Sequence, residues 1–126
     1  IEKAEAMMSG NAGLVLVVAL NYSGRWDIIQ AVIQSLQQIG INASWDDIES
    51  QLTQHLCLSD LPAPDLFIRT SGEQRISNFL LWQIAYAELY FTETLWPDFT
   101  KQNLYEAIIE YQKRERRFGK TSEQLS

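Results

Sequence analysis

One apolar run most constrains what this chain can fold into: Leu14-Val15-Leu16-Val17-Val18-Ala19-Leu20. It is rich in branched side chains and is bounded by Gly13 and Asn21. A continuous run of this kind is typical of a parallel strand that is covered on both faces, because a half-exposed strand alternates apolar and polar residues. It is far shorter than the roughly 20 residues that a membrane-spanning helix needs. The run therefore predicts an internal strand of an α/β protein.

The rest of the chain alternates between helical and strand patterns. Ser44 and Asp47 form a capping pair before a helix whose apolar stripe is Trp45, Ile48, Leu52 and Leu56. Thr100 is expected to cap a last helix with Leu104, Ala107, Ile108 and Tyr111 facing inward. The expected helices are 1–8, 24–39, the segment after Ser44, 78–83 and 104–118, and the expected strands are 14–20, 65–68 and 88–92. This order predicts an α/β fold with a parallel-stranded sheet flanked by helices.

Composition excludes several classes of function. The net charge of −6 argues against a general nucleic-acid binder. The single Cys57 cannot form an internal disulfide, which fits a reducing cytoplasm, and Cys57 is interpreted as a small core residue. His55 is the only histidine, so a site with several His ligands is excluded. Neither a P-loop nor a GxGxxG pattern is present, which leaves a nucleotide-binding function without support.

Basic residues crowd the end of the chain: Lys113, Arg114, Arg116, Arg117 and Lys120. One interpretation is a solvated helix end whose cations complement the helix dipole. The other is a contact with phosphate or with anionic lipid. Both interpretations stay open, above all for Arg116 and Arg117.

A second stretch, Ile68-Arg69-Thr70-Ser71-Gly72-Glu73-Gln74-Arg75-Ile76-Ser77, carries the candidate chemistry. Guanidinium groups suit phosphate oxygens, and ligands of parallel sheets lie beyond the carboxyl ends of the strands, where Arg69 is expected. Ser77 is expected at the start of the 78–83 helix, where backbone N–H groups also favour an anion. The alternatives are an Arg69–Glu73 surface pair, an ordinary exposed Arg75, and a purely capping Ser77. Glu73 is expected to order the loop.

Glu88 is a lone carboxylate in the apolar run Ala85-Tyr86-Ala87-Glu88-Leu89-Tyr90-Phe91. It is a candidate Mg²⁺ ligand, with a salt bridge to an arginine as the alternative. Aromatic side chains around it could line a hydrocarbon tunnel, although plain core residues are the first expectation for Trp82, Tyr86, Tyr90, Phe91 and Trp96.

These residues carry a resemblance to a known family. The chain resembles cis-prenyltransferases, and in particular their undecaprenyl diphosphate synthases. The likeness runs in order through blocks that cover most of the chain: Asn21–Ile28, Pro64–Gln83, Ala85–Phe91, Leu95–Phe99 and Arg114–Gly119. Ser23 stands where the family more often has Gly. A series of blocks with this order and spacing is far more specific than one RTSGE motif.

One departure is large. The chain resembles only the C-terminal half of the family's single domain, so residues 1–126 are expected to be a piece of a longer protein. The family's Asp-Gly-Asn-Gly-Arg-Trp loop, which holds its catalytic Asp and grips the allylic diphosphate, has no counterpart here. Asn21-Tyr22-Ser23-Gly24-Arg25-Trp26 only echoes that loop and is not assigned its role.

The resemblance implies an Mg²⁺-dependent transferase that condenses isopentenyl diphosphate onto farnesyl diphosphate and makes undecaprenyl diphosphate for the bacterial cell-wall lipid carrier. It implies isopentenyl diphosphate contacts at Arg69, Arg75, Ile76 and Ser77, and a metal at Glu88. It also implies a homodimer in the cytoplasm with peripheral membrane contact for product release, and no nucleic acid. A non-catalytic subunit and a different product length are the alternatives, and the 126 residues alone are expected to be inactive.

Overall fold

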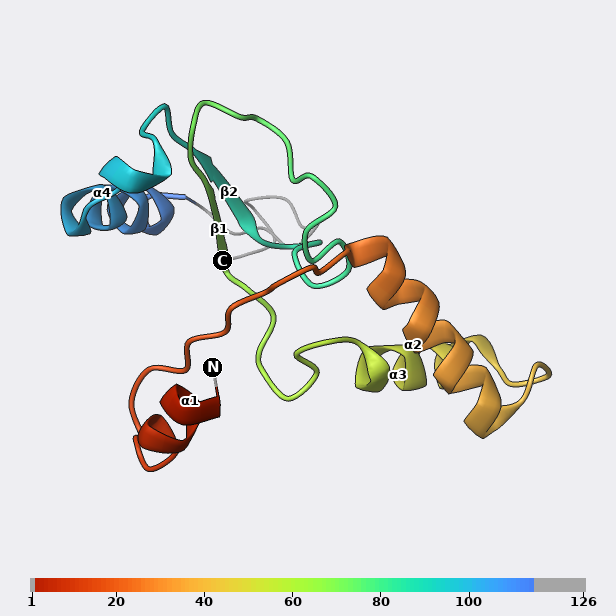
Figure 1. Ribbon diagram of the computed structural model, residues 1–126. Coiled ribbons are helices and arrows are strands. Elements are labelled where there is room, and N and C mark those ends of the chain that lie inside the picture. Colours follow the sequence, from red (N-terminus) through yellow and green to blue (C-terminus); the bar gives the residue numbers. More distant parts are fainter. Residues whose placement is uncertain (1, 115–126) are drawn as a thin grey trace.

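The computed structural model describes residues 2–114. Its elements are α1 (Glu2–Met8), α2 (Gly24–Ile39), α3 (Trp45–His55), β1 (Leu66–Arg69), β2 (Glu88–Phe91), a 3₁₀ turn η1 (Trp96–Asp98) and α4 (Lys101–Gln112). In Figure 1 the two strands lie between α4 on one side and the α2–α3 pair on the other, while α1 lies apart at the end of an extended segment. The expected last helix extends to 118, but α4 already ends at Gln112, where Lys113 is its C-cap; Arg116 and Arg117 lie outside the described residues.

The α2–α3 pair is an antiparallel helical hairpin (Figure 1). Gly40 ends α2 with a left-handed φ of 77°, which glycine adopts at little cost, and its N–H donates to the Leu36 carbonyl. Ser44 caps α3 by accepting the Asp47 N–H, as the capping pair predicts. Leu52 and Leu56 of α3 pack on Ala31 of α2 and form a small apolar core.

Part of the expected α3 stripe is wrong. Trp45 is 78% exposed, whereas Leu52 and Leu56 are buried. Trp45 is the first residue of α3 and directly follows the loop that joins the two helices, so it lies at the turn end of the hairpin, away from Leu52 and Leu56. The expected capping of α4 by Thr100 is confirmed, but α4 begins at Lys101 and buries Ala107 while Leu104 and Ile108 stay exposed.

The described sheet has two parallel strands. Phe67 of β1 packs on Leu80 and Ile84, which lie in the connection between the strands, and this second core is joined by Ile76 and Phe91 at its margin. Parallel strands confirm the expected fold class. The strands themselves are short, and β2 ends at Phe91, one residue earlier than expected.

The expected strand at 14–20 is wrong for the described chain. These residues are extended, but they form no ladder with β1 or β2. Leu14 is 92% exposed, and the rest of the run is exposed as well. A strand exists only by pairing with a neighbour, and an apolar run gains stability only when its faces are covered. Neither condition is met within residues 2–114.

Candidate functional site

The candidate site begins where β1 ends. Arg69 is the last residue of β1 and is half-buried, and the loop from Thr70 leaves the carboxyl end of the strand as expected. The loop folds back on the end of β2, because the Ser71 and Gly72 N–H groups donate to the Thr94 and Thr92 carbonyls at 2.9 Å. Gly72 has a φ of 69°, and a Cβ there would lie 2.5 Å from Glu93 Oε2. Glycine adopts this positive φ with less strain than other residues, whereas the Glu93 carboxylate is the end of a flexible side chain and could move away from a Cβ.

Arg75 extends the loop into solvent. Its side chain is 68% exposed, and it forms an ion pair with Glu73. The expected alternative partner for Glu73 was Arg69, so the pairing differs from that expectation. An exposed guanidinium held by one partly exposed carboxylate can exchange that partner for a phosphate group at low cost.

The segment after Arg75 corrects another expectation. Residues 78–83 form successive turns, and Ser77 does not cap a helix. Ser77, Asn78 and Leu80 have φ values of 48°, 62° and 45°, which are incompatible with a right-handed helix. Ile76 packs against the Phe67 core, so this part of the segment is anchored.

Behind this segment lies a buried carboxylate that the sequence analysis missed. Asp27, in the first turn of α2, is only 2% exposed. Its Oδ2 accepts from Tyr22 Oη at 2.7 Å and from Gln83 Nε2 at 3.1 Å, and its Oδ1 accepts from the Cys57 N–H at 2.8 Å. Gln83 also donates to the Cys57 carbonyl at 3.0 Å. One carboxylate thus joins α2, the end of α3 and the segment between the strands.

The protonation of this network follows from its contacts. Burial pushes the pKa of Asp27 upward, but the hydrogen bonds from the Cys57 backbone, Tyr22 and Gln83 outweigh it, and the pKa lies below its ordinary value. Burial, followed by the hydrogen bond to Asp27, raises the pKa of Tyr22 well above 10.0. Burial also raises the pKa of the Cys57 thiol, which is an argument against a reactive thiolate. Asp27 is therefore a charged acceptor surrounded by neutral donors.

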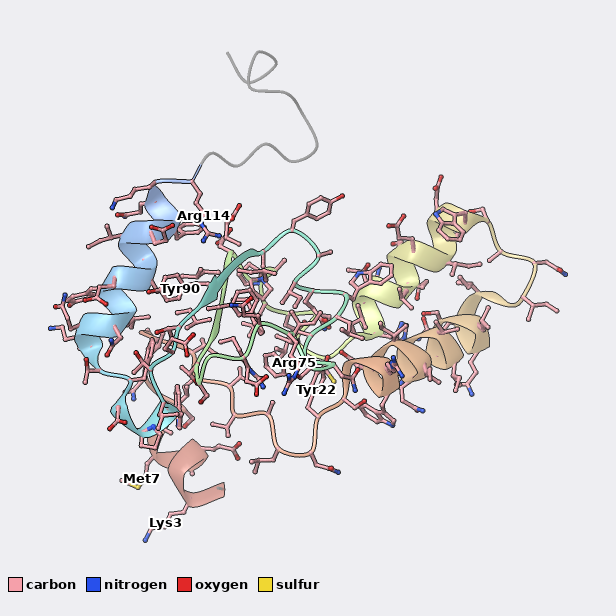
Figure 2. All side chains as sticks on the ribbon, turned by 90° about the horizontal axis from the view of Figure 1, so that it is seen from above. Lys3, Met7, Tyr22, Arg75, Tyr90 and Arg114 are labelled. Carbon is pink, nitrogen blue, oxygen red and sulfur yellow. The ribbon has the colours of Figure 1, made fainter. Side chains whose placement is uncertain are left out.

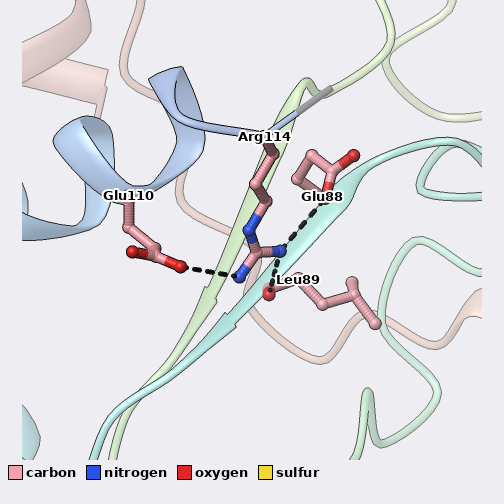
Figure 3. Close-up of polar contacts among 4 residues, drawn as sticks. All are labelled: Glu88, Leu89, Glu110 and Arg114. Atoms are coloured by element: carbon pink, nitrogen blue, oxygen red, sulfur yellow. Dashed lines mark hydrogen bonds and ion pairs between the residues drawn. The ribbon is translucent and has the colours of Figure 1, made fainter. Parts of the chain in front are cut away.

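Glu88 has the arginine partner that was its alternative. Its Oε2 accepts from Arg114 Nη1 at 3.0 Å, and the same nitrogen donates to the Leu89 carbonyl at 2.9 Å. Arg114 Nη2 lies 3.8 Å from Glu110 Oε1. Figure 3 shows the guanidinium between the end of α4 and β2. The side chains of Arg114 and Glu88 are 33% and 27% exposed, and their ion pair fastens the end of α4 to β2.

The strands separate Glu88 from Arg69. Glu88 pairs with Leu66 at the start of the parallel ladder, whereas Arg69 pairs with Phe91 at its end. At about 3.3 Å per residue, these levels are roughly 10 Å apart. Because side chains alternate between faces, Glu88 and Arg69 also point to opposite faces of the sheet. Figure 2 also shows that Arg75 and Arg114 lie well apart.

A metal site must be judged against this geometry. Among residues 2–114 no group of three or more His, Cys, Asp or Glu side chains could hold a metal ion. Mg²⁺ is often held by one or two carboxylates and completed by waters and substrate phosphates. Glu88 fits such a site as one ligand if Arg114 releases it. The metal assignment stays a prediction.

Apolar hollows flank the candidate residues. One of about 850 Å³ is lined by Arg69, Thr70 and Ser71 together with apolar side chains that include Phe67, Phe79 and Trp96. A larger one of about 1550 Å³ lies beside the 14–20 run and includes Trp82 and Tyr86. Trp82, Tyr86 and Trp96 are exposed, so the expectation that these three are plain core residues is wrong. A polar loop beside an apolar hollow suits a ligand with an anionic head and a hydrocarbon tail.

The fold and this loop define an α/β protein with a candidate diphosphate site at the end of a parallel strand. A family model described as "Putative undecaprenyl diphosphate synthase" matches residues 1–119, and the chain belongs to that family.

The sequences of curated relatives are similar to this one over nearly the whole chain. It is similar to an isoprenyl transferase of Nitrosomonas europaea, with 57% identity over 100% of the chain and 48% of the relative. It is also 54% identical, over 99% of the chain and 51% of the relative, to a ditrans,polycis-undecaprenyl-diphosphate synthase of Vibrio vulnificus, described as (2E,6E)-farnesyl-diphosphate specific. The chain spans about half the length of the curated relatives it matches.

Two solved structures share the fold. A lavandulyl diphosphate synthase from Lavandula x intermedia, in complex with dimethylallyl diphosphate, matches with a TM-score of 0.82 and 40% identity. That match covers 95% of this chain and 52% of the other. A probable undecaprenyl diphosphate synthase from Campylobacter jejuni matches with a TM-score of 0.65 and 42% identity, over 81% of this chain and 46% of the other.

Proposed function

We propose that the whole protein containing this chain elongates prenyl chains with cis geometry. It condenses isopentenyl diphosphate onto farnesyl diphosphate and makes undecaprenyl diphosphate, the precursor of the bacterial cell-wall lipid carrier. The observation that carries the proposal is the Arg69–Ser77 loop, which leaves a parallel strand beside an apolar hollow. Family membership and the names of the curated relatives support it.

The proposed roles of the loop residues follow from charge and position. Arg69 and Arg75 hold the diphosphate of isopentenyl diphosphate through charged hydrogen bonds, and Ser77 adds a hydroxyl. Ile76 contributes through the position of its backbone, since its side chain packs into the Phe67 core. Binding both substrates side by side lets the alkene attack the allylic carbon as diphosphate leaves, after which a proton is lost. The growing hydrocarbon chain would occupy apolar space of the kind that flanks the loop.

The proposal includes Mg²⁺ as cofactor. A bound Mg²⁺ neutralises charge on the departing diphosphate. Glu88 is the carboxylate that this chain would contribute, and Arg114 is the group that would have to release it.

Assembly and location belong to the same proposal and rest on the resemblance. They comprise a homodimer, a cytoplasmic location and peripheral contact with the membrane for product release. Within residues 2–114, none of the helices combines the length and the apolar character that crossing a bilayer requires.

The proposal is tested with the full-length protein, radiolabelled isopentenyl diphosphate, farnesyl diphosphate and Mg²⁺. The expected result is incorporation of label into a polyprenyl product whose length, by chromatography against standards, is that of undecaprenyl diphosphate. A shorter or longer product would correct the product and keep the reaction class. No incorporation by the purified full-length protein would refute the proposal and favour a non-catalytic subunit.

A further inference from the structure

The segment that carries Arg75 and Ser77 has an unusual backbone. Ser77 and Asn78 are consecutive residues with φ values of 48° and 62°. Asparagine tolerates the left-handed region better than most residues, whereas serine enters it at a cost. Conformations of this kind persist only where the surroundings hold them in place. The segment forms no helix of its own, so another element must hold it.

That element is the first turn of α2. The Asn78 carbonyl accepts the Gly24 N–H at 2.8 Å, and Asn78 Oδ1 accepts the Arg25 N–H at 2.9 Å. Asn78 Nδ2 donates to Ser23 Oγ at 2.9 Å. The first N–H groups of a helix have no partner within the helix, so a residue from outside can satisfy them. Asn78, Ser23, Gly24 and Arg25 together are called the Asn78 clamp below.

Glycine allows the clamp to close. A Cβ on Gly24 would lie 3.0 Å from the Asn78 carbonyl oxygen and 3.1 Å from the Leu81 nitrogen. Both neighbours are backbone atoms, so a larger residue would force the segment and α2 apart by a few tenths of an ångström. The close approach is therefore set by the backbone of both partners and by the side chains of Asn78 and Ser23.

We propose that Asn78 is a positioning residue for isopentenyl diphosphate, acting through the Asn78 clamp; this rests on the proposed function. Ser77 directly precedes Asn78, and Arg75 lies three residues before it. The clamp fixes the backbone from which both side chains extend toward the diphosphate. Tyr22, which directly precedes Ser23, and Ile76, which lies between Arg75 and Ser77, pack against the same apolar cluster, in agreement with this placement. The allylic substrate is expected to be indifferent to the clamp, because the loop residues are assigned to the other diphosphate.

The test uses two variants of the full-length protein. Asn78→Gly keeps the left-handed backbone and the carbonyl acceptor, and it removes the two side-chain hydrogen bonds. Ser23→Ala removes two hydrogen bonds: the one that Asn78 Nδ2 donates, and the weak capping bond from the Trp26 N–H at 3.4 Å. Ser44→Ala is the matched control, since Ser44 caps α3 through the same bond to the third helical N–H and has no contact with the clamp.

Steady-state kinetics with each substrate varied give the readout, and thermal unfolding shows that each variant is folded. The Michaelis constant (KM) for isopentenyl diphosphate should rise about 2- to 10-fold for each hydrogen bond lost, most in Asn78→Gly, while KM for farnesyl diphosphate stays unchanged. Ser44→Ala should lose comparable thermal stability with both constants unchanged.

The outcomes separate the inference from the function on which it rests. A parent without turnover would overturn both. An active parent with unchanged isopentenyl diphosphate KM in Asn78→Gly and Ser23→Ala would overturn the inference alone. An equal rise of both constants, or the same rise in Ser44→Ala, would show that the clamp acts only through overall stability.

Discussion

Replacing Asp27 by alanine should destabilise the protein more than any other single change to a polar side chain of α2. Asp27 is 2% exposed and accepts hydrogen bonds from Tyr22, Cys57 and Gln83. Alanine would leave three donors facing a site that has lost its only carboxylate. The carboxylate also links three separate parts of the chain, so its loss cannot be compensated by movement of one of them.

The magnitude follows from the number and kind of bonds. A hydrogen bond to a charged group contributes about 1.5–3 kcal/mol. The three bonds do not add fully, because removing Asp27 also removes its own cost of burial and lets water reach some donors. We expect a loss of about 3–5 kcal/mol, as for breaking other buried charged networks from one side. Asp27→Asn keeps the volume and one acceptor oxygen, and it should lose about half as much.

The assay is urea unfolding of the full-length parent and variants, followed by circular dichroism. Asp60→Ala is the control, because Asp60 is exposed and its loss should change the free energy of unfolding by less than about 0.5 kcal/mol. An Asp27→Ala variant as stable as the Asp60→Ala control would refute the structural role of the network.

The pH dependence gives an independent check. The Asp27 pKa is lower in the folded protein than its ordinary value of 3.8. Its contribution to stability is therefore complete above that value and is lost as the pH falls through the folded-state pKa. The gap in stability between parent and Asp27→Asn should shrink below about pH 4. A gap that is constant between neutral pH and this acid range would contradict the assignment.

Two further predictions concern the metal and the isolated chain. Glu88→Gln should lower Mg²⁺-dependent turnover and cost at most about 1 kcal/mol of stability. Arg114→Gln breaks the same ion pair but should keep the response to Mg²⁺. Equal effects of the two variants in a Mg²⁺ titration would make Glu88 a structural residue. The 126 residues alone should not incorporate isopentenyl diphosphate, and they should self-associate through the exposed 14–20 run. A chain that elutes as a 14.5 kDa monomer in size-exclusion chromatography and makes polyprenyl product would contradict both expectations.

Local signals were enough for much of the fold. The helical period between Gly24 and Ile39 ends at Gly40 because glycine readily takes the left-handed cap, and Ser44 starts the next helix through its own side chain. Such signals act between residues close in sequence, so they are visible in the sequence. The position of Arg69 at a strand end was predicted from such local signals, whereas the parallel strands were predicted from the alternation of helical and strand patterns along the chain.

The errors came from interactions between distant residues. The 14–20 run has the composition of a buried strand, but its state depends on neighbours that residues 2–114 do not supply. The 78–83 segment has a helical composition, yet Asn78 binds the start of α2, more than 50 positions away, and takes a backbone that excludes a helix. Tertiary hydrogen bonds thus override a local preference.

The candidate site was predicted in part. The motif around Arg69 and Arg75 was visible because its residue types are unusual in a short loop. Asp27 was not found, although it shares one helix face with Ala31 and Ser35, both of which are fully buried. The sequence signal that could have revealed Asp27 was its spacing of four and eight residues from Ala31 and Ser35, which puts a carboxylate on the buried face of the helix. The separation of Glu88 from Arg69 needed the strand register, which the sequence does not contain.

The most direct test of the central claim compares substrate KM values in the full-length parent, Arg69→Ala and Arg75→Ala. If the loop binds isopentenyl diphosphate, KM for this substrate rises about 10- to 150-fold, the equivalent of one charged hydrogen bond, while KM for farnesyl diphosphate stays within about twofold. Unchanged KM for isopentenyl diphosphate in both variants would contradict the claim that this loop holds its diphosphate.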